Sequence, residues 1–418
     1  MVRNLSSLRS LARAKTVRRT IRMQRLEKLN RSSSRGLKDT SSTLKILFLE
    51  PQPCIRALKY AIALRRCFGN RVSLCFGYTG HPLHKLYGFG EEYFDRIIRL
   101  DIKKASEAVN RIIKDYKPGI IHSHNAPDTL TLTAIDIDTE VPVIHDVHEI
   151  LTIHNSGFFA GDNEEKLTRY REEERRVCEK SDGLIHATGG IRRYVQQQYD
   201  VNADREIVFY NYVLESLMTH RFVRKLSERD GGIHIAYIGC ITSVVPGSHY
   251  DLRGIFNEIA DLGIHIHIYP TKDLITKSNN DYRRLAESSR FLHFHGTLDY
   301  RRLLYEITQY DFGWAGFNGE TNREHVNITL PNKVFDYVSS GLPIISFPHK
   351  TIQRFIEKHG LGLVVEDVDE LPRRLKDVNL SKLKERVMKS RCAFTMESNI
   401  LKLIEFYGRI TGGREKLG

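Results

Sequence analysis

The chain has 418 residues, 41% hydrophobic content, six cysteines and a formal net charge of +13. This length and composition predict two or three domains with apolar cores and exclude a disordered or fibrous protein. No apolar run approaches the roughly 18 residues that span a bilayer, so the sequence predicts no transmembrane helix. No two cysteines have the CxxC spacing, which favours reduced packing thiols and a cytoplasmic location.

The positive charge is concentrated in the first 43 residues. This segment holds twelve Lys or Arg residues against two acidic ones, Glu27 and Asp39. A solvated arm is the default interpretation, and the alternatives are an interfacial helix that binds an anionic membrane surface and a cleaved organelle targeting segment. No aromatic residue lies among the basic ones, so nucleic acid is not an expected partner.

From residue 44 onward, apolar strands alternate with helices such as 54–68, 102–116 and 164–180. The first set of predicted strands is 45–50, 71–78, 96–101, 119–124, 141–148, 183–188 and 206–210. The second set is 233–239, 264–269, 291–295, 311–315, 344–347 and a last strand near Val365. This alternation predicts an α/β fold with two Rossmann-like, doubly wound parallel sheets.

The order of the elements divides the chain into five parts. We expect a tail over 1–43, an acceptor-side domain over 44–212, a linker over 213–232, a nucleotide-sugar domain over 233–395, and a C-terminal helix over 396–418 that packs back on the first domain. Ligands of doubly wound sheets bind at the carboxyl ends of the strands. The sequence therefore predicts a site in the cleft between the two sheets.

The most informative segment is PNKVFDYVSSGLP, residues 331–343. Pro331 and Gly341 are typical of the start and end of a helix, and a strand follows. Helical spacing places Lys333, Asp336, Tyr337 and Ser340 on one side, which we expect to be free to bind. A lysine in the first turn opposes the helix dipole unless an anion lies there, so this terminus is a candidate phosphate site.

The run PNKVFDYVSSGLPIISF resembles the donor-binding signature of retaining GT-B glycosyltransferases of the broad family 4 type. Further segments between about 44 and 410 resemble pieces of that family in the family's order: GIIHSHN, VPVIHDVHE, SDGLIHATGGIRRYV, IVFYNYV, IAYIGCI, FHGTLDYRRLL and YDFGWAGFN. The resemblance departs at the first strand-to-helix turn, EPQPCIR, which lacks the glycines of many members. It also departs at Ile328, where many members have a glutamate.

The resemblance implies a hexosyltransferase that uses a nucleotide-sugar, with uridine as the expected base, and needs no metal or other cofactor. It implies that Asp336 binds the ribose and that Lys333 holds the diphosphate. Arg253, which follows the glycine turn from Gly239 to Gly247, is our second candidate for the diphosphate. The remaining donor-side candidates are Asn332, Gly239, Gly296 and Leu298. On the sugar and acceptor side, the resemblance implies that His148 contacts the transferred sugar, and the other candidates are His124, Glu149 and Glu320. The acceptor is not defined, and a lipid-linked molecule or a glycan is expected.

Two alternatives come from other classes of protein. His122 and His124 on one strand, with His145 and His148 on the next, suggest a zinc or iron site of a metal-dependent hydrolase. That hypothesis leaves the second domain and the 331–343 segment unexplained. A nucleotide-sugar epimerase or a binding protein could also use the same two-domain fold.

Overall fold

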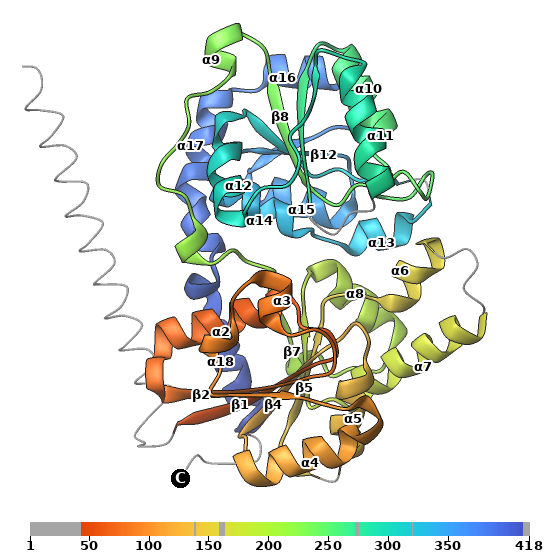
Figure 1. Cartoon of the computed structure of the whole chain (residues 1–418), viewed down its shortest axis with the longest axis vertical. Helices are drawn as coiled ribbons and strands as arrows, with labels where there is room; N and C mark the ends of the chain where they lie inside the picture. The colour runs from red at the N-terminus through yellow and green to blue at the C-terminus, as the bar shows by residue number, and fades with distance from the viewer. Residues whose placement is uncertain (1–42, 138, 159–163, 272–275, 320, 413–418) are drawn as a thin grey trace, which may run out of the picture.

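The protein is described by a computed structural model that covers residues 43–137, 139–158, 164–271, 276–319 and 321–412. The basic tail and Glu320 lie outside these residues. Two parallel sheets form the centres of two domains, one above the other in Figure 1. No helix in the described ranges has the length and apolarity needed to cross a membrane.

The first sheet has seven strands in the order β3-β2-β1-β4-β5-β6-β7. The strands are β1 (Leu44–Glu50), β2 (Val72–Tyr78), β3 (Arg96–Arg99), β4 (Ile120–His124), β5 (Val143–Val147), β6 (Gly183–His186) and β7 (Glu206–Val208). Helices α2 (Ile55–Phe68), α3 (Leu83–Tyr87), α4 (Ala105–Tyr116), α5 (Thr129–Asp136), α6 (Leu151–Phe158), α7 (Glu164–Lys180) and α8 (Gly189–Gln198) connect them.

The second sheet has six strands in the order β10-β9-β8-β11-β12-β13. They are β8 (His234–Gly239), β9 (His265–Pro270), β10 (Leu292–Phe294), β11 (Phe312–Trp314), β12 (Ile344–Ser346) and β13 (Gly362–Val364). The helices of this part are α9 (Ser227–Asp230), α10 (Arg253–Asp261), α11 (Thr276–Glu287), α12 (Tyr300–Glu306), α13 (Arg323–Ile328), α14 (Asn332–Ser339), α15 (Lys350–His359), α16 (Leu371–Asp377) and α17 (Leu380–Ser390).

Both sheets are doubly wound, which confirms the predicted fold class. Strand order reverses between β1 and β4 in the first sheet and between β8 and β11 in the second. Each predicted strand is present, and the differences are of a few residues at strand ends, as at 206–210, where β7 ends at Val208. Central strands such as β1, β4 and β5 were identifiable because they are largely buried on both faces and therefore read as nearly continuous apolar runs.

Strand β1 shows how the first core is divided. Ile46 and Phe48 belong to one buried apolar cluster, whereas Leu47 and Leu49 belong to another. Since successive side chains of a strand point to opposite faces, the two clusters cover the two faces of the sheet. The cluster around Ile46 continues into the second domain, where the Phe335 ring lies 5.5 Å from the Tyr212 ring.

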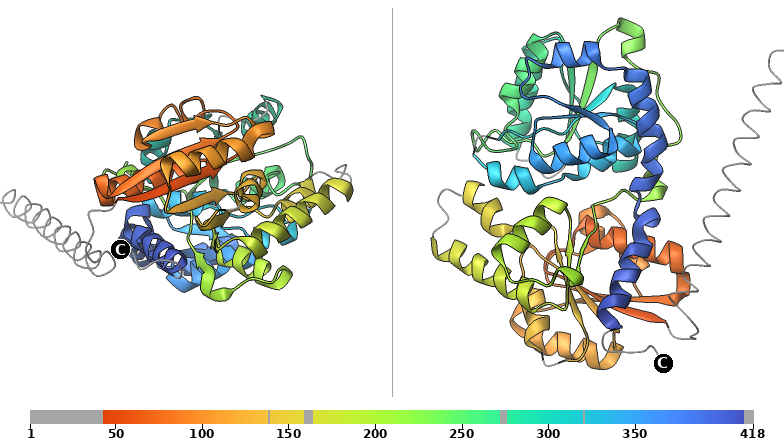
Figure 2. Two further views of the ribbon diagram at one scale, coloured as in Figure 1. Left: turned by 90° about the horizontal axis from the view of Figure 1, so that it is seen from below. Right: turned by 180° about the vertical axis from the view of Figure 1, so that it is seen from behind.

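The chain crosses between the domains twice, and the two crossings lie side by side. Val213, on the way out of the first domain, forms a parallel bridge with Thr395, on the way back. Helix α18 (Met396–Thr411) then packs on α2, and the Tyr407 hydroxyl lies 2.6 Å from Nδ1 of His122. Figure 2 shows α17 and α18 following one side of the molecule from the second domain to the first.

Candidate functional site

Helix α14 occupies the 331–343 segment, and its ends follow the sequence. Pro331 is extended, with φ −70° and ψ 152°, and precedes the first helical residue. Gly341 follows the last turn with φ +77°, a left-handed conformation that glycine adopts without steric cost. The helix is buried from Lys333 to Ser339.

The expected free polar face of this helix was wrong for two of its four residues. The Tyr337 hydroxyl donates to the carbonyl oxygen of Trp314 and accepts from the backbone N–H of Ile238, both at 3.0 Å. The Ser340 hydroxyl donates to the carbonyl oxygen of Leu304 at 2.9 Å. These hydroxyls stabilise the packing of α14 and are not available to a ligand, because buried polar groups require such partners.

Lys333 is buried, yet its ammonium has no hydrogen-bond acceptor in the described part of the chain. The Nζ atom lies 3.8 Å from the ring centroid of Tyr237. It also lies 3.3 Å from the position that a Cβ atom would take on Gly239, which ends β8 with φ +125°. Burial lowers the pKa of Lys333 to about 7, against the opposing effect of Cys240 and Asp336. A desolvated cation of this kind favours an anionic ligand beside the Gly239 turn.

Asp336 lies one turn further along α14 and is also buried. One of its carboxylate oxygens accepts a hydrogen bond from the Tyr300 hydroxyl. Burial raises the pKa of Asp336, and the positive charges of Lys59 and Lys333 act in the opposite direction. Lys59 belongs to α2 of the first domain, so both domains supply charged groups to this region. The sequence did not indicate Lys59 or Tyr300 as site residues, because their neighbours along the chain do not show that both lie near Asp336.

The other donor-side candidates lie at exposed positions or have partners of their own. Asn332 is exposed at the start of α14. Arg253, the first residue of α10, pairs with Asp251 at 2.8 Å through Nε. Gly296 has φ +73° and open space where a side chain would project, whereas Leu298 packs against the largest apolar cluster. The structure thus brings Gly239, Lys333 and Asp336 together and gives Arg253 a local partner.

A buried charge cluster lies at the carboxyl ends of β4 and β5. The Asp146 carboxylate pairs with Nε of Arg56 at 2.9 Å and accepts from the Tyr60 hydroxyl at 2.9 Å. Nε2 of His122 lies 3.3 Å from the same carboxylate. These contacts, above all the charge of Arg56, hold the pKa of Asp146 well below its usual range although burial opposes this.

The predicted sugar-side histidines lie next to this cluster. The His124 ring stacks on His122 at 4.7 Å between centroids, and the His148 ring lies 5.9 Å from His124. Burial lowers the pKa of His148 to about 4, so its imidazole is neutral at pH 7. Burial raises the pKa of Glu149 to about 7. Glu320, the last of these candidates, lies outside the described residues.

The four histidines of the hydrolase alternative do not form one ligand set. His145 lies on the other face of β5 from Asp146, where its ring nitrogens contact Thr131 at 2.9 Å and Asp128 at 3.5 Å. His122, His124 and Asp146 do have neighbouring ligand atoms, but Asp146 is already paired with the guanidinium of Arg56. The prediction failed because adjacent residues of a strand point to opposite faces.

A hollow of about 810 Å³ opens at the carboxyl ends of β1 to β4. It is lined by the turn after β1 that lacks glycines, by the turn after β2 and by residues that follow β3 and β4: Pro51, Gln52, Thr79, Gly80, Arg99, Asp101 and Thr129. Neither Lys333 nor Asp336 lines it. The hollow is therefore separate from the charged groups of α14.

Sequence reasoning also missed a group of three histidines between the domains. His154, His249 and His325 have ligand atoms within 4.8 Å of one another. They come from α6, from the segment between β8 and α10, and from α13. No local motif joins three residues so far apart in the chain, so only the fold reveals the group.

Comparison with known proteins finds a family model for each of the two domains. A model of glycosyltransferase family 4 matches residues 61–213, and a model of the glucosyltransferase 3-like C-terminal domain matches residues 265–395. Glucosyltransferase 3 of Streptococcus parasanguinis is 31% identical over 78 residues, a match that spans 19% of this chain and 23% of that protein.

Solved structures show the same fold. A glycosyltransferase from Rickettsia africae superimposes with a TM-score of 0.66 at 12% identity, over 89% of this chain and 99% of that one. HepE of Anabaena in complex with UDP-glucose superimposes with a TM-score of 0.57 at 12% identity, over 88% of this chain and 98% of that one. The first domain therefore matches glycosyltransferase family 4, the second matches the glucosyltransferase 3-like C-terminal domain, and the chain has the GT-B fold of glycosyltransferases.

Proposed function

We propose that the protein transfers a hexosyl unit from a UDP-sugar to an acceptor, with retention of configuration at the anomeric carbon and without a metal ion in the chemical step. The observation that carries this proposal is the buried ammonium of Lys333, which lies beside Gly239 and near Asp336 and has no acceptor among the residues that the structure describes. A nucleotide diphosphate would supply the missing anion. UDP-glucose is the first donor to test, because the relative is a glucosyltransferase and one structural neighbour binds UDP-glucose.

In this proposal Lys333 stabilises the negative charge that develops on the leaving diphosphate. A fixed positive charge in a buried site does this without the reorganisation that water requires, so a metal ion is not needed for the step. The backbone at Gly239 and Gly296 borders the nucleotide. The carboxylate of Asp336 accepts from a ribose hydroxyl through the oxygen that Tyr300 leaves free.

The sugar is proposed to lie toward His148 and Glu149, in the loop that follows β5. The neutral imidazole of His148 has a buried Nδ1 with no partner among the described residues, so it can hydrogen-bond a sugar hydroxyl. His148→Ala should then lower turnover more than donor affinity, because the imidazole contacts the reacting sugar rather than the nucleotide.

Titration with donors tests the proposal. Chelator-treated protein is mixed with UDP-glucose, UDP-N-acetylglucosamine or GDP-mannose, and binding is followed by calorimetry and melting temperature. A donor at a hundredfold excess over its Kd should stabilise the protein by about 2.7 kcal/mol. Release of UDP by the chelator-treated protein would support transfer without metal, whereas a strict metal requirement or the absence of UDP-sugar binding would overturn the proposal.

The acceptor is proposed to bind in the hollow at the carboxyl ends of β1 to β4, and the basic tail is proposed to hold the protein at an anionic membrane. Ten net positive charges in residues 1–43 should attract anionic vesicles by up to about 1 kcal/mol for each basic residue near the surface. A protein that begins at Ser42 should keep donor affinity and lose vesicle binding. Equal sedimentation of both proteins with anionic vesicles would show that the tail is not an anchor, and a mature N-terminus near residues 35–44 would identify a targeting segment.

A further inference from the structure

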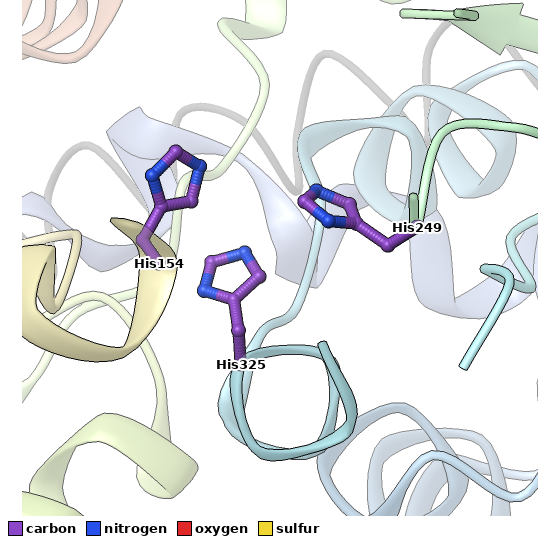
Figure 3. A group of neighbouring side chains, drawn as sticks. All are labelled: His154, His249 and His325. Carbon is purple, nitrogen blue, oxygen red and sulfur yellow. The ribbon is translucent and has the colours of Figure 1, made fainter. Parts of the chain in front are cut away.

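Three histidine rings converge where the two domains face each other (Figure 3). His154 is on α6 of the first domain, His249 lies between β8 and α10, and His325 is on α13. The ring centroids of His154 and His325 are 4.8 Å apart, those of His249 and His325 are 5.1 Å apart, and those of His154 and His249 are 6.1 Å apart. One ring nitrogen from each residue lies within 4.8 Å of the other two.

We propose that His154, His249 and His325 bind one zinc ion, which ties the first domain to the second. Imidazole nitrogen is a preferred ligand of zinc, and three such ligands with a fourth position left open is an established zinc geometry. Nitrogens around tetrahedral zinc lie about 3.3 Å apart, so ligation would draw the ligand nitrogens together by at most about 1.5 Å. The ion acts as a tie between domains, and the transfer step does not require it.

The burial of the rings suits a set of metal ligands. His249 and His325 are both buried. Nδ1 of His325 has no partner among the described residues, so this nitrogen can bind a metal ion.

Three other groups of side chains in the described ranges have neighbouring ligand atoms, and none of them joins the two domains. The Asp146 carboxylate near His122 and His124 is paired with Arg56, and the Glu50 carboxylate near Cys54 and His124 accepts from the backbone N–H of Cys54. In the group of Asp230, His234 and His265, Nε2 of His234 lies 3.1 Å from Asp230. This last group is useful as a control, since it places two imidazoles and a carboxylate together in the second domain.

The surroundings hold the three histidines in place from both sides. The side-chain amide of Asn322, at the start of α13, donates to the carbonyl oxygen of His154 at 3.3 Å, so a polar contact already joins α6 to the second domain here. The His249 ring packs 4.1 Å from Tyr250 and 5.6 Å from Phe317. Zinc would reinforce an existing contact between the domains.

The test uses the full-length protein, stripped of metal with a chelator, dialysed, and titrated with ZnCl₂ in a calorimeter. We expect one tight site per chain and a higher melting temperature with zinc. His154→Ala and His325→Ala should each weaken zinc binding by at least about a hundredfold, as expected when a ligand is removed. His265→Ala alters the group of Asp230, His234 and His265 and should leave the tight site unchanged.

The outcome is independent of the donor, because no nucleotide-sugar is present in the titration. Melting curves of each metal-free variant verify that it folds, and His154→Ala provides a second variant in the other domain if His325→Ala does not fold. Absence of a tight site in the wild-type protein would overturn the proposal. So would a tight site that survives His154→Ala and His325→Ala or disappears with His265→Ala.

Discussion

The two domains each bury a charged cluster, and the clusters differ in how fully their charges are paired. In the first domain, Asp146 contacts Arg56, Tyr60 and His122, and Arg56 also donates to the carbonyl oxygen of Phe209 at 2.8 Å. In the second domain, Lys333 has no hydrogen-bond acceptor in the described part of the chain.

This difference in pairing predicts a structural role for the first cluster and a ligand-binding role for Lys333. Nη1 of Arg56 has no partner among the described residues, but the net charges of Arg56 and Asp146 compensate each other. Breaking such a pair leaves an uncompensated ion. A charge that is buried without a partner reduces stability unless something binds to it. The Asp146 cluster is therefore expected to stabilise the first domain, whereas Lys333 is expected to bind an anionic ligand. Four changes test this contrast, and they follow in order of expected size.

Asp146→Asn should produce the largest effect, a loss of about 3 to 5 kcal/mol in the free energy of unfolding, because it leaves the buried guanidinium of Arg56 without a counter-charge. Chemical denaturation followed by circular dichroism measures it. The double variant Arg56→Met with Asp146→Leu removes both charges and should regain most of the stability. If the double variant is as unstable as Asp146→Asn, the uncompensated charge is not the cause.

Lys333→Met should reduce turnover by about a hundredfold to a thousandfold, as the loss of one group that stabilises transition-state charge typically does. Its unfolding free energy should stay level or rise, since the buried unpaired ammonium is gone. Lys225→Met is the matched control, because the ammonium of Lys225 donates to the carbonyl oxygens of Thr308 and Tyr310. That control should lose stability and keep turnover, and a similar loss of stability in Lys333→Met would contradict the contrast.

Asp336→Asn should weaken UDP binding by about 1.5 to 3 kcal/mol, roughly tenfold to a hundredfold, because it removes a charged acceptor from the ribose. Calorimetry with UDP measures it. Tyr300→Phe removes the neighbouring hydroxyl but leaves the carboxylate, so its effect on UDP affinity should be smaller. Equal UDP affinity in wild type and Asp336→Asn would exclude the ribose role.

The fourth change is a change of pH, whose effect on stability is the smallest for a single step, at most about 1.4 kcal/mol for one pH unit. The folded pKa of Lys333 is about 7, below its ordinary value of 10.5. Between these values the unfolded chain holds a proton that the folded lysine has released, so this residue makes stability rise with pH above about 7. Bound diphosphate retains the proton, so UDP affinity should fall over the same range. Lys333→Met should lack both trends, and parallel pH curves for the two proteins would refute the assignment.

The sequence predicted the fold well because the strands are buried on both faces and read as apolar runs such as 45–50. It also singled out Lys333 and Asp336 as candidates, since a helix bounded by Pro331 and Gly341 with ionic groups on its first turns is unusual, and their roles stay a prediction. It failed at Tyr337 and Ser340, because helical periodicity reports which side of a helix is polar but not whether backbone groups of other segments satisfy it. Lys59, Tyr300 and the three interdomain histidines were missed because residues far apart in the chain meet only in the folded protein.

The bridge between Val213 and Thr395 marks the place where both chain crossings lie side by side. We expect any rotation of one domain against the other to turn about this place, because the covalent connections are confined to it. Displacement in such a rotation grows with distance from the axis. In Figure 1, helices α6 and α13 lie on the side opposite the crossings. A small rotation about Val213 would therefore change the distance between the domains most at this edge, where His154 and His325 lie. A zinc ion bound by both histidines would oppose such a rotation with the longest lever arm.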